Sequence, residues 1–402
     1  MKRSDTRILT THAGSLPRPD DLIDLYRSNA ADSTLLPRLT SAVGDVVRRQ
    51  VEAGIDVVND GEFGKAMRQS VDYGAWWSYI YDRLEGFEIL ETQAANASLG
   101  LMATNSKDRA DFREFYESGL AMSGGSTSTS GSQQATAASR LAQMTCTGPV
   151  KYTGHSRIQR DVANLKSALE GVQIEDAFMT AVSPATLQIL PNQHYGSQED
   201  YTWALAEAIR EEYQAIVEAG FNLQIDDPAL VDLYDWWFSG KEDFAGYRKW
   251  AEFQVEAVNH ALEGIPEERV RFHICWGSWH GPHSTDVPLK DVVDLLLKVR
   301  AQAYSVEAGN VRHEHEWKVW QTAGLPEGKL LIPGVVSHAT NVLEHPELIA
   351  DRLANYASVA GRENVIAGSD CGLGGRIHPQ LAWAKLRALR EGADLATRQL
   401  WR

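Results

Sequence analysis

The chain has 402 residues, of which 43% are hydrophobic and 23% are charged, and its net charge is −15 at pH 7. This length provides for a large buried core, while the acidic balance argues against nucleic acid or an anionic membrane as partner. No run of about 18 apolar residues predicts a membrane span, and three cysteines argue against a disulfide framework. The N-terminus lacks the apolar core of a signal peptide, so we expect a cytoplasmic protein; a homo-oligomer is compatible with this composition.

Short apolar runs that end in polar residues alternate with helical patterns along the chain. The helices are predicted from apolar residues at helical spacing, at about 38–53, 202–220 and 346–361. The strands are predicted at 8–16, 55–63, 143–152, 176–184, 221–230, 271–277, 303–309, 330–336 and 364–372.

Strand–helix alternation predicts an α/β fold with a parallel sheet. A doubly wound sheet would also gather its strand ends on one edge. Six of the predicted strands, however, end in polar residues, and six such ends fit a closed ring of strands better than an open sheet. We therefore expect a (β/α)8 TIM barrel with loop insertions, plus one strand outside it, forming a single domain over 1–402. The active site of such a barrel lies at the carboxyl ends of its strands.

Three segments depart from this rhythm. Residues 122–140 are rich in Ser, Thr, Gly and Ala and predict a mobile insertion, a solvated loop rather than a lid over the barrel. The aromatic runs 74–81 and 234–238 predict core and helix packing, with an aromatic wall for a ligand as the alternative.

The stretch 273–288, HICWGSWHGPHSTDVP, begins with His273 and Cys275. Residues i and i+2 of a strand point to the same side, so this pair presents an imidazole and a thiolate to one point. A buried His and Cys without a metal is an equally good interpretation of this pair alone. Cys371 and Glu307 lie at the ends of two other predicted strands, and the four side chains together make a ligand set suited to Zn²⁺. Such an electron-rich site favours a bound, deprotonated thiol over a hydroxide.

At this point the sequence resembles the catalytic half of the cobalamin-independent methionine synthases and their short single-barrel relatives, which include epoxyalkane:coenzyme M transferases. The resemblance extends through nearly the whole chain as ordered motifs at strand ends: THAGSLPRP, VVNDGEFGK, CTGPV, QIDDPAL, FHICWG, YSVEAG and SDCGLG. It implies a barrel of the type shared with uroporphyrinogen decarboxylase. It also implies that His273, Cys275, Glu307 and Cys371 bind Zn²⁺.

The resemblance further implies roles in substrate binding. Gly14 and Ser15 match a loop that binds the carboxylate of homocysteine, and Glu62 and Asp226 match acids that hold its amino group. His338 matches an acid that protonates the leaving group. Each residue also has a structural interpretation, such as a helix cap for Ser15 or His338 and an ion pair with Lys65 or Arg68 for Glu62.

The sequence also departs from the family. It leaves no room for the second, N-terminal barrel of the full-length synthases, and His155 stands where a tryptophan stacks on folate, which puts methylfolate in doubt as the methyl donor. The His-rich segments 280–288 and 312–317 look more like the short relatives. Their histidines are interpreted as solvated, with an acceptor pocket or a second metal site as the alternatives. The arginines considered for an anionic substrate tail are Arg18, Arg68 and Arg312.

The leading interpretation is a zinc-dependent enzyme that transfers an alkyl group from a small-molecule donor to a small thiol acceptor, with methyl transfer to homocysteine as the leading case. Addition of a thiol such as coenzyme M to an epoxide is the first alternative, and Asp226 with Glu62 would then have no amine to bind. A metal-free decarboxylase and a non-catalytic thiol or zinc carrier are the alternatives of other classes.

Overall fold

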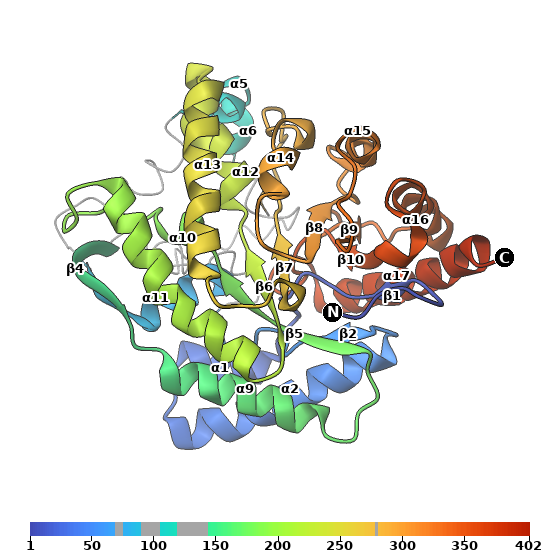
Figure 1. The fold of residues 1–402 in the computed structure, drawn as a ribbon. Helices are drawn as coiled ribbons and strands as arrows, with labels where there is room; N and C mark the ends of the chain where they lie inside the picture. The colour runs from blue at the N-terminus through green and yellow to red at the C-terminus, as the bar shows by residue number, and fades with distance from the viewer. Residues whose placement is uncertain (69–74, 90–104, 119–143, 278–279) are drawn as a thin grey trace.

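The computed structural model of the chain, shown in Figure 1, describes residues 1–68, 75–89, 105–118, 144–277 and 280–402. The predicted insertion at 122–140 lies outside the described residues. Among the helices of the described part, none combines the length and the apolar character that crossing a membrane requires.

Eight parallel strands form a nearly closed barrel, which confirms the (β/α)8 prediction. Their order around the barrel is β1-β10-β9-β8-β7-β6-β5-β2. The bounds of the strands are β1 (Leu9–Thr10), β2 (Val57–Val58), β5 (Asp176–Val182), β6 (Asn222–Asp226), β7 (Val270–His273), β8 (Ala303–Glu307), β9 (Leu330–Val336) and β10 (Ile366–Ser369).

Side-chain and loop hydrogen bonds join β1 to β2 where the ring closes. The backbone N–H of Asp56 donates to Thr10 O at 3.1 Å, and the carboxylate of Asp56 accepts from the N–H of Thr10 at 2.9 Å. Further along, Thr11 Oγ1 donates to Val57 O at 3.1 Å. Only two residues of each predicted strand, 8–16 and 55–63, pair with a neighbouring strand, and the residues that follow them form loops at the mouth of the barrel.

The strand predicted at 143–152 is the one that lies outside the barrel. It is β4 (Met144–Tyr152), which pairs in antiparallel fashion with β3 (Leu84–Ile89). Pro149 lies within β4 and has no N–H to donate, so this strand is unsuited to a central position in a sheet.

Helices surround the strands, and in Figure 1 α2 and α9 lie side by side below the sheet, while α16 and α17 lie together at the right, next to β9 and β1. The predicted helix 38–53 begins earlier, at Asp32, and includes Pro37. The longer helices are α1 (Asp20–Arg27), α2 (Asp32–Glu52), α9 (His155–Leu169), α11 (Gln198–Glu218), α13 (Phe244–Ala261), α16 (Pro346–Ala360) and α17 (Pro379–Leu400).

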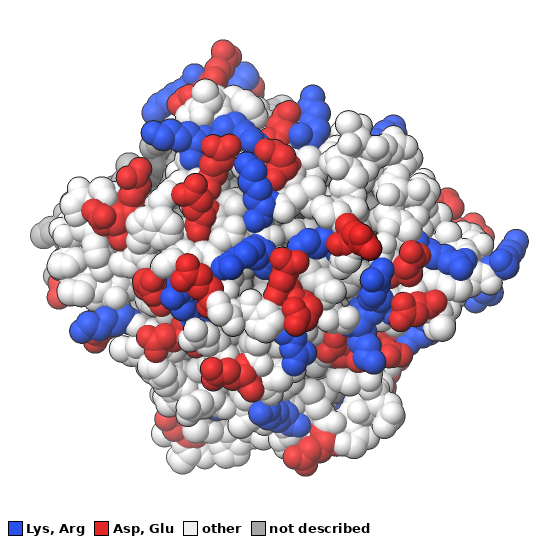
Figure 2. Space-filling model, in the orientation of Figure 1, with Lys and Arg blue, Asp and Glu red and all other residues white. Residues whose placement is uncertain are grey.

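The core lies between these helices and the strands, whose residues are almost all buried. The run 234–238 forms a short π-helix, and its Phe238 packs against the core beside Tyr247 of α13, in agreement with the packing interpretation. On the face shown in Figure 2, acidic and basic side chains are interspersed. The acidic excess is therefore not gathered into one patch on this face.

Candidate metal centre and substrate pocket

A pocket opens at the carboxyl ends of the strands, where the fold predicts the active site. It is lined by residues from loops and strand ends that are far apart in sequence: Ala13, Ser15, Glu62, Met67, Trp76, Asp226, Pro228, His273, Cys275, Cys371, Gly372, Gly374 and Arg376. Two thiols, an imidazole, two carboxylates and a guanidinium therefore face one space. This combination suits a small polar ligand.

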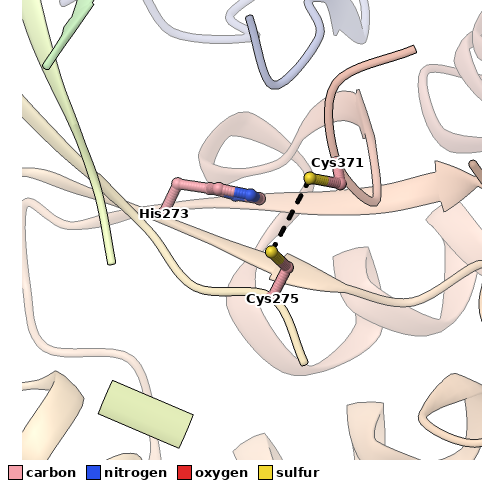
Figure 3. A group of neighbouring side chains, drawn as sticks. All are labelled: His273, Cys275 and Cys371. Carbon is pink, nitrogen blue, oxygen red and sulfur yellow. Dashed lines mark hydrogen bonds between the residues drawn. The ribbon is translucent and has the colours of Figure 1, made fainter. Parts of the chain in front are cut away.

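Two thiols and an imidazole meet at one side of this pocket (Figure 3). Sγ of Cys275 lies 3.6 Å from Sγ of Cys371, and one ligand atom from each of these residues and His273 falls within 4.8 Å of the others. Nδ1 of His273 is bonded to Ser305 Oγ at 3.0 Å, which leaves Nε2 buried without a hydrogen-bond partner among the described residues. A buried nitrogen of this kind requires an explanation, and a metal ion bound between Nε2 and the two sulfurs would supply one.

Neighbouring strands orient these side chains. His273 is the last residue of β7 and is in register with Ser305 of β8 on one side and with Asp226 of β6 on the other. Cys275 and Cys371 follow the ends of β7 and β10. The hydrogen bond between Nδ1 of His273 and Ser305 Oγ fixes the ring of His273, as outer partners commonly do for a metal-binding histidine.

The carboxylate of Glu307 lies behind this group of three rather than within it. Oε1 of Glu307 accepts from the backbone N–H of Trp276 at 2.8 Å, and Oε2 accepts from Nδ2 of Asn310 at 2.9 Å. Each oxygen retains a second lone pair. Glu307 is therefore oriented by its neighbours and keeps the capacity to bind a cation.

The surroundings of the two thiols shift their pKa values in opposite directions. The hydrogen bond from Cys275 lowers the pKa of Cys371 well below its usual value, and although burial opposes this change, His273 and His338 add to the lowering. The same hydrogen bond, together with burial, raises the pKa of Cys275. Burial lowers the pKa of His273, but the nearby sulfur of Cys371 and the charges of Asp226 and Glu307 outweigh burial and raise it.

Two buried carboxylates, Glu62 and Asp226, also line the pocket, and Asp226 is in register with His273 on the neighbouring strand. Oε1 of Glu62 accepts from Thr180 Oγ1 at 2.8 Å and lies 3.6 Å from Nζ of Lys65, whereas Oε2 is buried without a partner among the described residues. Asp226 accepts from Nε2 of Gln224 at 2.7 Å. Burial raises the pKa of Asp226 to about 7, the positive charge of His273 opposes this shift, and the charge of Glu62 adds to it. A cation between the two carboxylates would relieve this strain.

The backbone around Glu62 is adapted to its place in the pocket. Glu62 has φ 62°, a left-handed conformation that is rare for a side chain of this kind. Gly14 packs directly against it, because a Cβ on Gly14 would lie 2.4 Å from Oε1 of Glu62. Such strain is common where a fold holds a functional group in place.

Ser15 lies beside the segment that follows Cys371. Its backbone carbonyl accepts from the N–H groups of Leu373 and Gly374, each at 2.9 Å, and its hydroxyl donates to Gly374 O at 3.4 Å. Ser15 does not cap α1, whose N-cap is Pro19. The 11–16 loop is thus joined to the segment that carries the second thiol.

His338, in the segment after β9, is 1% exposed, and neither of its ring nitrogens has a hydrogen-bond partner among the described residues. It lies close enough to Cys371 to lower the pKa of that thiol. It does not cap α16, because His345 does so by accepting from Glu347 N. His338 is therefore available for proton transfer near the sulfurs.

Neither His155 nor Arg312 lines the pocket, whereas Arg18 contacts the lining residues Ser15 and Met67. The ring of His155 is exposed at the start of α9, 2.7 Å from Glu211 and edge-on to Tyr152. Arg312 is exposed and donates to Ser284 O. Arg18 is buried and donates to backbone carbonyls of the 62–65 loop.

Sequence reasoning missed two lining residues, Met67 and Arg376, neither of which lies at a strand end. Trp76 also lines the pocket, and it belongs to the aromatic run 74–81, for which an aromatic wall for a ligand was the alternative interpretation. The prediction that the histidines of 280–288 and 312–317 are solvated was wrong for His283 and His313, which are 6% and 2% exposed. Their carboxylate partners, described below, keep them buried.

The sequence of the chain is similar to those of known enzymes over nearly its whole length. Over its whole length, the chain is 22% identical to 2-hydroxypropyl-CoM lyase of Xanthobacter autotrophicus, covering 98% of that protein. It is 25% identical to methionine synthase of Saccharolobus solfataricus, with 98% of this chain and 96% of the relative covered.

Solved structures show the same fold. A B12-independent methionine synthase from Shewanella sp. W3-18-1, in complex with selenomethionine, superposes with a TM-score of 0.69 at 20% identity, covering 98% of this chain and 99% of the other. The family model for the catalytic domain of cobalamin-independent synthase matches residues 184–395, slightly more than half of the chain. The chain therefore belongs to the cobalamin-independent synthase catalytic domain family.

Proposed function

We propose that the protein is a zinc-dependent enzyme that transfers an alkyl group to a small thiol, with methyl transfer to homocysteine as the leading case. The observation that carries the proposal is the meeting of His273, Cys275 and Cys371 within 4.8 Å at a pocket that also holds two buried carboxylates. Family membership and the names of the relatives support the same class of reaction.

The donor set fits Zn²⁺. Two thiolates and one imidazole nitrogen are ligands that zinc prefers, and Nε2 of His273 is buried without another partner among the described residues. Glu307 would complete the set as the most replaceable ligand. When bound there, the metal would keep an incoming thiol deprotonated and nucleophilic at neutral pH.

The side chains of the pocket would hold the acceptor. Glu62 and Asp226 would bind an ammonium group between them, and the Gly14–Ser15 loop would bind a carboxylate. The burial of these groups excludes water, and a thiolate without hydration is a stronger nucleophile. His338 would donate a proton to the leaving group, since its ring nitrogens are not engaged elsewhere among the described residues.

The residues of the pocket indicate less about the alkyl donor than about the thiol acceptor. The exposed ring of His155, paired with Glu211, is not among the residues that line the pocket, which favours a donor that does not rely on stacking at this position. Addition of a thiol to an epoxide is the second candidate, supported by the full-length similarity to 2-hydroxypropyl-CoM lyase. In that reaction Glu62 and Asp226 would have no amine to bind.

A thiol panel tests the proposal. The purified protein is analysed for zinc, and zinc-edge X-ray absorption is then recorded with homocysteine, coenzyme M, glutathione and cysteine. We expect one tightly bound zinc per chain, and one additional sulfur ligand with homocysteine. An additional sulfur with coenzyme M alone supports the epoxide reaction instead. A protein that retains no zinc contradicts the proposal and supports the decarboxylase alternative.

A further inference from the structure

Four buried ionisable side chains form a chain of ion pairs between the segments that follow β7 and β8. Oδ2 of Asp286 lies 2.9 Å from Nδ1 of His283 and 2.9 Å from Nε2 of His313, and Nδ1 of His313 lies 2.9 Å from Oε2 of Glu316. The side chains of all four are between 3% and 7% exposed. We call these four residues the ionic clamp.

Trp276 connects the ionic clamp to the candidate metal ligands. Its ring stacks on the imidazole of His313, with centroids 3.8 Å apart and an interplanar angle of 16°. Its indole N–H donates to Val287 O at 2.8 Å, and its backbone N–H donates to Oε1 of Glu307 at 2.8 Å. Trp276 directly follows Cys275 in the chain, so one residue is tied to two candidate ligands.

The clamp also fixes the two segments to each other. Oε1 of Glu316 accepts from the backbone N–H of Leu289 at 2.7 Å, so Glu316 bonds to the segment after β7 as well as to His313. Burial lowers the pKa of His313, but hydrogen bonds to Asp286 and Glu316 outweigh burial and raise it to about 10. The clamp therefore holds an imidazolium between two carboxylates at neutral pH.

Stability alone does not account for such a cluster. Buried ion pairs add little to stability compared with well-packed apolar side chains of similar volume, because removing charges from water is costly. Their geometry is more demanding than that of an apolar contact, and they are well suited to defining one position of a loop.

We propose that the ionic clamp is a positioning device that fixes Trp276 and, through it, the thiol of Cys275 and the carboxylate of Glu307 at the metal. This inference rests on the proposed function, because it assumes a metal at the sulfur pair. The clamp touches neither the sulfurs nor the pocket. Its effect is expected in metal affinity and in the geometry of the metal's ligands.

The test uses cobalt(II) as a spectroscopic probe in the full-length protein. His313→Phe keeps a ring over Trp276 but loses both ion pairs, and Glu316→Gln keeps an acceptor for Leu289 N while removing one charge. His315→Gln is the matched control, because His315 is an exposed histidine of the same segment. Metal affinity is measured by competition with a chelator, and the thiolate-to-cobalt absorption band is recorded for each variant.

We expect His313→Phe to weaken cobalt binding roughly tenfold or more, the range known for outer partners of metal ligands, and to alter the thiolate-to-cobalt band. Glu316→Gln is expected to change both in the same direction by less, and His315→Gln to leave both unchanged. Glu316→Gln decides the test should His313→Phe fail to fold. Wild-type affinity and an unaltered band in the folded variants overturn the clamp but leave the proposed function intact. A wild-type protein that binds no metal overturns both.

Discussion

Lys385 of α17 holds the segment that carries His338, and its replacement by Met is expected to lower the free energy of unfolding substantially. The side chain of Lys385 is fully buried, and its Nζ donates to Val342 O at 2.6 Å and to both oxygens of Glu344 at 2.9 and 2.8 Å. Oε1 of Glu344 also accepts from the backbone N–H of Ser337, next to His338, at 2.8 Å.

The expected loss of unfolding free energy depends on the charge of Glu344, which stays buried after Lys385 is replaced. Removing one partner of a buried ion pair costs about 3–5 kcal/mol, because the other charge is left without compensation. Glu344 keeps its bond from Ser337 N, and its side chain is 7% exposed, so we expect the lower end of this range, about 3 kcal/mol. Lys385→Met combined with Glu344→Gln removes the stranded charge and is expected to cost only about 1 kcal/mol.

Urea unfolding followed by tryptophan fluorescence measures these free energies, and kcat is determined on the same samples. Lys298→Met is the control, since Lys298 is 57% exposed and 4.0 Å from Glu252; an exposed pair of this kind contributes at most about 1 kcal/mol. A Lys385→Met variant as stable as this control, or a double variant no more stable than Lys385→Met alone, would refute the reasoning.

Three further predictions concern the site. Cys371→Ser is expected to lose most of the zinc by elemental analysis while Cys146→Ser, in β4, keeps it; full zinc in the first variant contradicts the ligand set. Glu62→Gln is expected to raise the KM for homocysteine roughly 10- to 100-fold, the loss of one charged hydrogen bond, but not the KM for 4-mercaptobutanoate, which lacks the amine; equal effects on both thiols exclude the amine role. Burial raises the pKa of Asp60 to about 6, so the folded protein holds a proton there that the unfolded chain releases near pH 4, and stability falls as pH rises through this window by about 3 kcal/mol. Other buried acids, such as Asp226, titrate in the same range, so Asp60→Asn is expected to reduce the total loss of stability between pH 4 and pH 7 by about 3 kcal/mol in urea titrations, and an unchanged loss argues against it.

The convergence of distant strand ends could be predicted from the sequence because the fold itself enforces it. Parallel strands of a barrel present their carboxyl ends on one face, so Cys275 and Cys371 were expected together, and their sulfurs lie 3.6 Å apart. The orientation of Glu307 toward Trp276 N and Asn310 could not be predicted, because it depends on loop backbone rather than on strand register.

Other features depend on contacts that no local pattern reveals. Pro149 argues against a central position for β4, but nothing in the sequence identifies β3 as its partner. The burial of His313 depends on its ion pairs with Asp286 and Glu316. In the sequence, His313 stands among charged residues, and such a segment is typical of a surface loop. Arg376 lines the pocket because of the path of the loop that carries it, and the spacing of apolar residues in the sequence does not predict the path of a loop.

The seam between β1 and β2 has a consequence for how this protein could acquire new substrates. The candidate metal ligands all come after residue 270, at or just beyond the ends of β7, β8 and β10, whereas Gly14, Ser15 and Glu62 belong to two loops beside the seam. Exchange of residues 11–16 and 59–68 would therefore change Gly14, Ser15 and Glu62 but leave His273, Cys275 and Glu307 in place, provided that the backbone of Ser15 still accepts from Leu373 and Gly374 beside Cys371. A library confined to those two loops offers a direct route to re-engineering the choice of thiol.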